Sequence, residues 1–151
     1  MKKILFVCTG NTCRSAMAEY IFNNKVFLKR LDNKYSANSA GVAVYASTAA
    51  SDYSILAMRN EGIDINNHKS SQINEKRIKE ADLVLCMTER HAEYLKKSFS
   101  DYKDKIYSIS GYLHNNQDVI DPYGLGYEEY KKTAKQLDVI CEDIIKKMET
   151  E

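Results

Sequence analysis

The sequence has little that would draw it to nucleic acid or to a membrane. Its 22 Lys and Arg residues nearly balance 21 Asp and Glu, so that the net charge is only +1. A charge this small gives no general attraction to polyanions, and any anion that the protein binds must be captured by a local site. No apolar run approaches the roughly 20 residues that span a bilayer, and the opening residues are too few for a secretory leader. We therefore expect a cytoplasmic protein with neither nucleic acid nor membrane among its partners.

Cysteine is also scarce. The four cysteines are Cys8, Cys13, Cys86 and Cys141. They are too few and too spread out for a disulfide scaffold, and no two form a C-x-x-C metal pair. In a reducing compartment they remain thiols, so thiol chemistry is open to this chain.

The length and the apolar pattern predict the fold. A chain of 151 residues with 44% hydrophobic content can bury one core. Short apolar runs alternate with segments whose apolar residues recur every three or four positions. The expected strands cover 4–7, 35–40, 82–87 and 106–109, and the expected helices cover 15–31, 48–61, 89–97 and 127–147. This alternation predicts a single-domain α/β fold over residues 1–151, a four-stranded parallel sheet with helices on both faces.

Between the first expected strand and the first expected helix, the chain reads Cys8-Thr9-Gly10-Asn11-Thr12-Cys13-Arg14-Ser15. Gly10 and Asn11 tolerate left-handed backbone angles, so the loop can curl and point successive N–H groups at one anion. The positive end of the following helix and the planar guanidinium of Arg14 suit phosphate oxygens. An ordinary structural turn is the alternative, but the strand before and the helix after favour a phosphate-binding loop.

The same loop would make Cys8 a nucleophile. A free thiol has a pKa of about 8.5, and inward N–H groups, a helix N-terminus and a nearby guanidinium all favour the thiolate. These donors also stabilise the phosphoryl oxygens while phosphorus moves from the substrate to sulfur. A hydrogen bond from Ser15 to the sulfur would make it a better leaving group in the second step.

A nucleophilic cysteine needs a general acid to protonate the leaving group, and Asp121 is the best candidate. It precedes Pro122, the only proline in the chain, whose ring restricts how the carboxyl group is presented. Asp-Pro is also a common turn signal, so this pair alone does not decide the role. The neighbouring Tyr123 can form a wall of a pocket. No histidine has the spacing of a cysteine-protease triad.

Further motifs follow along the chain. They are Met17-Ala18-Glu19, Ser39-Ala40-Gly41, Gly62-Ile63 with His68, Asp82-Leu83-Val84-Leu85 with Met87-Thr88, and Asp121-Pro122-Tyr123. Together with the loop from Val7 to Ser15, they resemble the low-molecular-weight protein tyrosine phosphatase family over nearly the whole chain and in the family's order. The resemblance implies no metal and no other cofactor.

The resemblance also implies roles for the matching residues. Cys8 would form a phosphocysteine intermediate, Arg14 would clamp the phosphoryl oxygens, and Asp121 would protonate the leaving group and then activate water. Asn11 would hold the shape of the loop through a polar network with Ser39 and His68. The remaining residues that it places around the phosphate are Thr9, Gly10, Thr12, Cys13 and Ser15. Cys13 would match the family's partner cysteine for a reversible disulfide.

The loop version Thr-Gly-Asn-Thr-Cys-Arg-Ser resembles the bacterial protein-arginine phosphatases, whose tyrosine-directed relatives usually carry Ile at the position of Thr12. A Thr hydroxyl suits a polar guanidinium, whereas Ile offers an apolar wall to a phenol ring. Tyr123 is followed by Gly124, where many tyrosine-directed members carry a second aromatic. Ala16, where the family often has Pro, is a good helix former. We expect phosphoarginine on proteins as the substrate, with phosphotyrosine as the alternative.

Two other functions stay open at this level. Thiol-coupled arsenate reduction on the same fold needs two further cysteines close together, and neither Cys86 nor Cys141 has a cysteine neighbour. A non-catalytic anion-binding or redox module would use Cys8 and Cys13 without turnover. The oligomeric state is not predicted.

Overall fold

The four strands form one parallel sheet. The computed structural model describes residues 1–151, and the strand order is β2-β1-β3-β4. The strands are β1 (Lys2–Cys8), β2 (Tyr35–Gly41), β3 (Leu83–Cys86) and β4 (Ile106–Ser108). The prediction of a four-stranded parallel sheet is confirmed, with β1 paired to β2 and β3.

Helices lie between the successive strands, as parallel pairing requires, and two more follow the last strand. The helices are α1 (Arg14–Leu28), α2 (Asp52–Asn60), α3 (Glu75–Glu80), α4 (Glu89–Ser98), α5 (Ile109–Leu113) and α6 (Tyr127–Glu149), with a 3₁₀ helix η1 (Ser100–Lys105). The four expected helices are present, whereas α3, η1 and α5 were not expected because each is too short to show an apolar period. None of the helices combines the length and the apolar character needed to cross a bilayer.

Side-chain caps explain two boundaries that differ from the prediction. The helix expected from residue 48 begins at Asp52, because the Ser51 hydroxyl accepts a hydrogen bond from the Ser54 N–H at 3.3 Å. Ile109 was expected to end a strand, but it begins α5. The cause is the Ser108 hydroxyl, which accepts from the Gly111 N–H at 2.9 Å and starts a helix there.

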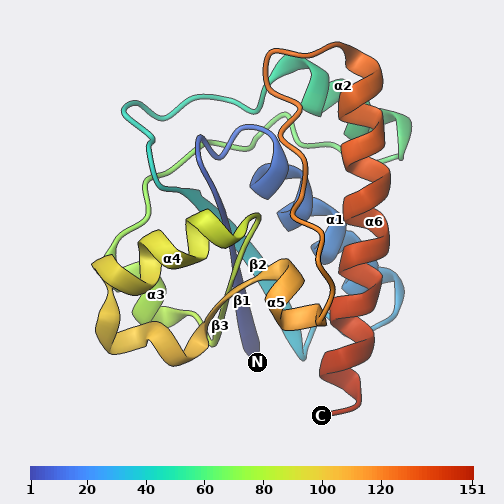
Figure 1. Cartoon of the computed structure of the whole chain (residues 1–151). Helices are drawn as coiled ribbons and strands as arrows, with labels where there is room; N and C mark the ends of the chain where they lie inside the picture. The colour runs from blue at the N-terminus through green and yellow to red at the C-terminus, as the bar shows by residue number, and fades with distance from the viewer.

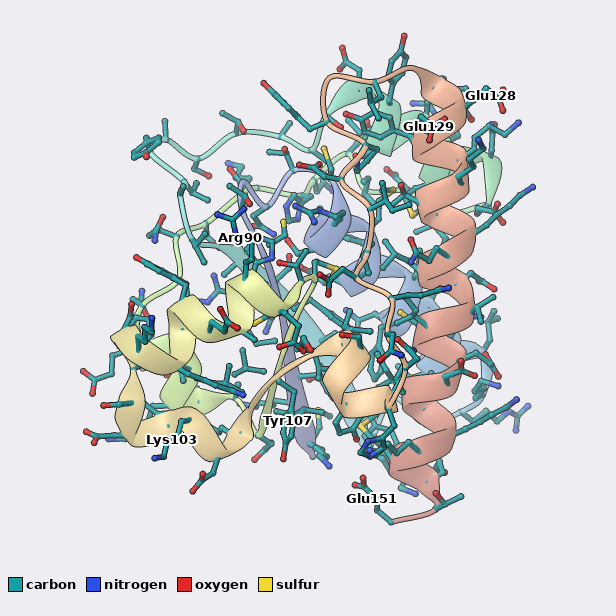
Figure 2. The ribbon with its side chains drawn as sticks, in the orientation of Figure 1. Arg90, Lys103, Tyr107, Glu128, Glu129 and Glu151 are labelled. Carbon is teal, nitrogen blue, oxygen red and sulfur yellow. The ribbon has the colours of Figure 1, made fainter.

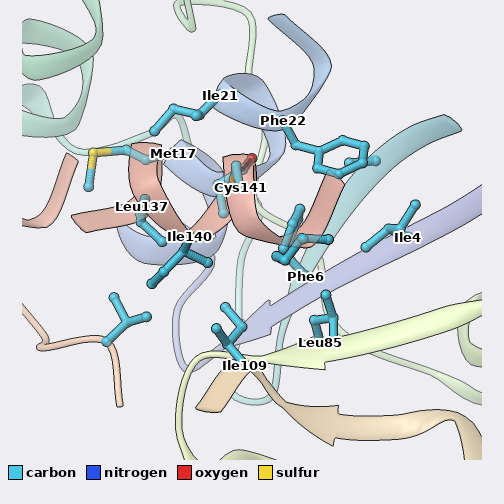
Figure 3. Packing of buried hydrophobic residues seen from close by; sticks show 14 of the residues in the cluster. Ile4, Phe6, Met17, Ile21, Phe22, Leu85, Ile109, Leu137, Ile140 and Cys141 are labelled. Atoms are coloured by element: carbon cyan, nitrogen blue, oxygen red, sulfur yellow. Dashed lines mark hydrogen bonds between the residues drawn. The ribbon is translucent and has the colours of Figure 1, made fainter. Parts of the chain in front are cut away.

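Both faces of the sheet are covered, and β1 shows this most clearly. Ile4 and Phe6 point into the larger apolar cluster, whereas Leu5 and Val7 point into a second cluster. The larger cluster lies under α1 and α6, and Figure 3 shows Phe6 among side chains of both helices. The second cluster contains buried residues of α3 and α4, which lie on the opposite side of the sheet (Figure 1). Alternating directions along β1 therefore produce the two-sided fold.

This architecture brings distant segments to the carboxyl ends of the strands. The loop after β1 lies there, and the segment between α5 and α6 crosses beside it (Figure 1). Val119 anchors this second segment, since its N–H donates to the Met87 carbonyl at 3.0 Å, just beyond β3. Asp121 and Tyr123 follow two and four residues later, so the fold delivers them to the same edge.

Candidate active site

The loop Cys8–Ser15 turns sharply from β1 into α1. Asn11 adopts the left-handed conformation with φ of 57°, as the sequence predicts, whereas Gly10 is not among the residues with positive φ. The end of the neighbouring strand β2 has no side chain that would keep the loop away. A side chain at Gly41 would place its Cβ 2.5 Å from the Thr9 carbonyl oxygen, so only glycine fits there. The curled loop therefore depends on Asn11 within it and on Gly41 beneath it.

The sulfur of Cys8 is surrounded by donors. It lies 2.8 Å from Ser15 Oγ and accepts from the Asn11 backbone N–H at 3.3 Å. The Asn11 side-chain amide donates to Ser15 Oγ at 2.8 Å, while its oxygen accepts from the Ser71 N–H at 3.0 Å. Ser15 Oγ accepts this bond, and its one proton has two acceptors in reach, the Cys8 sulfur at 2.8 Å and the Ala40 carbonyl oxygen at 3.4 Å, of which the sulfur is nearer. Such donors stabilise negative charge on sulfur and favour its departure from phosphorus.

Arg14 is fixed beneath the loop that carries Asp121. Its side chain is 6% exposed, and Nη1 donates to the Val119 carbonyl at 3.0 Å. Nη2 lies 3.5 Å from Asp121 Oδ2, and the second oxygen of that carboxylate accepts from the Tyr123 N–H at 3.0 Å. The carboxylate remains half exposed, at 52%. The guanidinium of Arg14 and the carboxylate of Asp121 therefore lie side by side next to the loop.

These residues enclose one pocket of about 260 Å³. It is lined by Cys8, Thr9, Gly10, Asn11, Thr12, Cys13, Arg14, Asp121 and Tyr123. The predicted site residues on the loop after β1 and on the segment before α6 thus come together, with Ser15 buried behind the sulfur. Helix α1 starts here with no side chain capping its first N–H groups, so these donors are free for an anion.

Similarity to known proteins identifies this arrangement. Residues 3–151 match the family described as Low molecular weight phosphotyrosine protein phosphatase. The protein-arginine-phosphatase of Bacillus subtilis is 36% identical over 146 residues, which cover 96% of this chain and 95% of that one. A solved low molecular weight protein tyrosine phosphatase from T. tengcongensis superposes with a TM-score of 0.93 at 42% identity, over 97% of this chain and 99% of the other.

A second solved structure is similar over most of its length. It is a mutant of the YwlE arginine phosphatase with a phosphorylated active-site serine, 34% identical with a TM-score of 0.92, covering 97% of this chain and 95% of that one. The chain belongs to the low molecular weight phosphotyrosine protein phosphatase family. The expected family, with its likeness to the bacterial arginine phosphatases, is confirmed, and so is the expectation of a phosphatase.

In this family member, the polar network behind the loop differs from the expectation at one residue. His68 Nε2 lies 2.8 Å from the Asn11 carbonyl oxygen, as expected. Ser39, however, donates its hydroxyl to Glu19 at 2.6 Å and does not bond to Asn11. The residue that bonds to the Asn11 side chain is Ser71, through its backbone N–H. Burial raises the pKa of Glu19, although the hydrogen bond from Ser39 opposes this shift.

Besides Ser71, His91 also contacts the loop, and this contact was not predicted from the sequence. Its Nε2 lies 2.9 Å from Thr9 Oγ1, and its Nδ1 lies 3.0 Å from Thr88 Oγ1. Burial first, and then the charge of Arg14, lowers the pKa of His91 to about 4, so the ring is neutral at pH 7. The sequence did contain a signal for this contact. Thr88 directly follows the apolar strand and is a typical helix cap, and the first turn of the helix that it caps contains His91.

The cysteines of this phosphatase lie in three different settings, and all four are free. Cys13 Sγ lies 3.4 Å from Ser51 Oγ and 3.6 Å from the Tyr130 hydroxyl. Burial and then Cys13 raise the pKa of Tyr130 to about 12. Cys86 and Cys141 are fully buried in different apolar clusters, and burial raises the pKa of both thiols. Cys86 and Cys141 therefore do not form the further pair of neighbouring cysteines that arsenate reduction needs.

Proposed function

We propose that the protein hydrolyses phosphoarginine on phosphorylated proteins through a phosphocysteine intermediate at Cys8. The single observation that carries this proposal is the sulfur of Cys8, held by Ser15 and Asn11 in a pocket that Arg14 and Asp121 close. A reducing, cytoplasmic compartment is part of the proposal, since it keeps the nucleophile a thiol.

In the first step, the sulfur attacks phosphorus in line with the leaving group. The S–P bond forms as the P–N bond breaks, and a proton from Asp121 goes to the departing guanidine nitrogen. Arg14, the loop N–H groups and the free N-terminus of α1 hold the phosphoryl oxygens, where the charge of the transition state accumulates. Asp121 can serve as the acid because it is the only carboxylic residue that lines the pocket.

In the second step, water attacks the phosphocysteine. Asp121 takes one proton from the water, the O–P bond forms as the S–P bond breaks, and inorganic phosphate leaves. The sulfur departs as a thiolate, which the Ser15 hydroxyl stabilises, since its Oγ lies 2.8 Å from the sulfur. The step needs no co-reactant besides water.

Support for phosphoarginine comes from Thr12 and Tyr123 at the pocket. Thr12 brings a hydroxyl to a wall where an aliphatic side chain would favour a flat phenol ring. Tyr123 is the single aromatic residue in the lining, and Gly124 after it has φ of 78°. Asp121 can also pair with the cationic guanidinium of the substrate. The first relative described above is named a protein-arginine-phosphatase.

Phosphotyrosine is the second candidate. Tyr123 is 74% exposed at the pocket rim and can stack on a phenol ring, and the T. tengcongensis protein is named a tyrosine phosphatase. We expect kcat/KM to be higher for a phosphoarginine peptide than for a phosphotyrosine peptide of matched sequence. Equal or inverted values would contradict the arginine assignment and support this second candidate.

The role of Thr12 is tested on the same two peptides. Thr12→Ile is expected to shift the ratio of kcat/KM toward phosphotyrosine by roughly tenfold, because it replaces a hydroxyl with apolar surface. The matched control is Thr150→Ile at the exposed C-terminal end, which should leave the ratio unchanged. An unchanged ratio in Thr12→Ile would show that Thr12 only shapes the loop.

Cys8→Ser separates catalysis from a binding or redox module. We expect this variant to lose phosphate release from both peptides and from an aryl phosphate. A wild-type protein without turnover on any of the three would favour the module. Arsenate-dependent oxidation of thioredoxin that requires Cys86 would instead favour the reductase.

A further inference from the structure

A second hollow lies directly beside the phosphoryl pocket. Its volume is about 410 Å³, and it shares Thr9 and Arg14 with that pocket. The other residues that line it belong to the start of α4 and its cap, and they are Thr88, Arg90, His91 and Tyr94. The hydrogen bond between Thr9 and His91, 2.9 Å long, joins the loop to the helix here. The hollow therefore borders the phosphoryl pocket, within reach of residues that flank the phosphorylated side chain of a bound peptide.

The lining of the hollow is positively charged, because Arg14 has an acidic partner in Asp121 whereas Arg90 has none. None of its lining residues is acidic, and the low pKa of His91, about 4, keeps that ring neutral. Arg90 is exposed and makes no ion pair or side-chain hydrogen bond within the chain. Figure 2 shows it at the start of α4, on the side of the loop after β1.

Two carboxylates near the start of α4 are already engaged, and Glu93, one turn along the helix, makes no ion pair with Arg90. Asp118 accepts a hydrogen bond from the Glu89 backbone N–H at 3.1 Å, and the Glu89 side chain accepts from Ser108 on the β4 side of the helix. Asp121 faces Arg14 from the other pocket. Arg90 is thus the unpaired cation of this surface. The ring of Tyr94 beside it is 53% exposed and offers apolar area to the methylene groups of a bound side chain.

We propose that this hollow is a subsite for an Asp or Glu side chain that flanks the phosphorylated residue of the protein substrate. The Arg90 guanidinium would bind the carboxylate with its planar fork, and Tyr94 would contact the methylene groups. This inference rests on the proposed function, because it concerns the same substrate chain. It makes the enzyme selective for phosphorylated residues in acidic sequence.

The test uses three phosphoarginine peptides that differ only at the positions one and two residues on either side, filled with Glu, Gln or Lys. Wild-type kcat/KM is expected to be about three- to tenfold higher for the Glu peptide than for the Gln peptide, and lowest for the Lys peptide. The difference should shrink as salt is added, since the subsite is open to solvent.

Arg90→Gln is expected to bring the Glu-to-Gln ratio close to one. Arg90→Lys should keep a smaller preference, because an ammonium group lacks the fork. The matched control is Arg59→Gln, which removes the same charge from an exposed residue that borders a different hollow, and it should keep the wild-type ratio. A wild-type ratio of one, a ratio that survives Arg90→Gln, or an equal loss in both Gln variants would overturn the subsite.

A failure of the acidic subsite can be distinguished from a failure of the proposed phosphoarginine phosphatase activity. If phosphotyrosine peptides are hydrolysed and phosphoarginine peptides are not, the substrate assignment fails and the Glu-to-Gln comparison on phosphotyrosine peptides decides the subsite. If neither is hydrolysed, the Kd values of the Glu and Gln peptides for the unmodified enzyme decide it, with equal values against the subsite.

Discussion

At the scale of single residues, Asp121 has the most exposed position of the proposed catalytic groups. Its carboxylate is held from one side by the Tyr123 N–H and faces the Arg14 guanidinium at 3.5 Å from the other. It is half exposed, so a leaving group and water can both reach it. A group in this position matters most where the departing atom is a poor leaving group.

Asp121→Asn is therefore expected to lower kcat/KM, which reports the step that expels the leaving group, about 100- to 1,000-fold on phosphoarginine and phosphotyrosine peptides. The loss should be much smaller for 4-nitrophenyl phosphate, whose phenolate leaves without protonation. Steady-state kinetics on the three substrates measure this, with Asp143→Asn on the exposed side of α6 as the control. The same loss on every substrate would argue that Asp121 only positions Arg14.

At the scale of elements, the start of α4 ties a helix to the phosphate loop. Thr88 Oγ1 accepts from the His91 N–H at 3.2 Å and also contacts His91 Nδ1, whose opposite nitrogen reaches Thr9. The cap therefore does two things at once. It satisfies a free N–H of the helix and sets the orientation of the imidazole ring.

Thr88→Ala is expected to lower the free energy of unfolding by about 1 kcal/mol, because the cap and its bond to the ring are both lost. Thr88→Ser keeps the hydroxyl and should retain most of the stability. Urea unfolding measures the difference, and Thr150→Ala at the chain end should change the stability by less than about 0.5 kcal/mol. A Thr88→Ala protein as stable as the wild type would contradict this account of α4.

At the scale of the whole molecule, acid should weaken the fold through His91. The pKa of this buried ring is lowered to about 4, whereas an unfolded histidine titrates near 6.5. Between these values the unfolded chain binds more protons than the folded one, so stability falls as the pH drops from 6.5 toward 4. Above pH 6.5 both states are neutral and the effect vanishes.

The fall in Tm between pH 7 and pH 4.5 should thus be smaller in His91→Asn than in the wild type. His114→Asn is the control, since His114 is exposed and asparagine tolerates its left-handed φ of 59°. The comparison between variants removes the contribution of carboxylates that titrate in the same range. Equal falls in all three proteins would assign the acid sensitivity to other groups.

The sequence by itself determined the parts of this protein that depend on neighbours along the chain. The apolar run ending at Cys8, the helical period of residues 127–147 and the turn chemistry of Asn11 each reflect local backbone physics. The sheet, the curled loop and the placement of Asp121 in a loop beside Pro122 were predictable for that reason. So were the long helices, although their ends were not.

Only the tertiary structure decided which distant groups meet. Val119 reaches Arg14, Ser71 replaces Ser39 beside Asn11, and His91 bonds to Thr9, across separations of 60 to 105 residues. Short helices such as α3 and α5 also form only against the rest of the fold, since they are too short to hold together through their own turns. Contacts between distant residues leave no period or spacing in the sequence, because they depend on how the strands are ordered and on which loops meet at the end of the sheet.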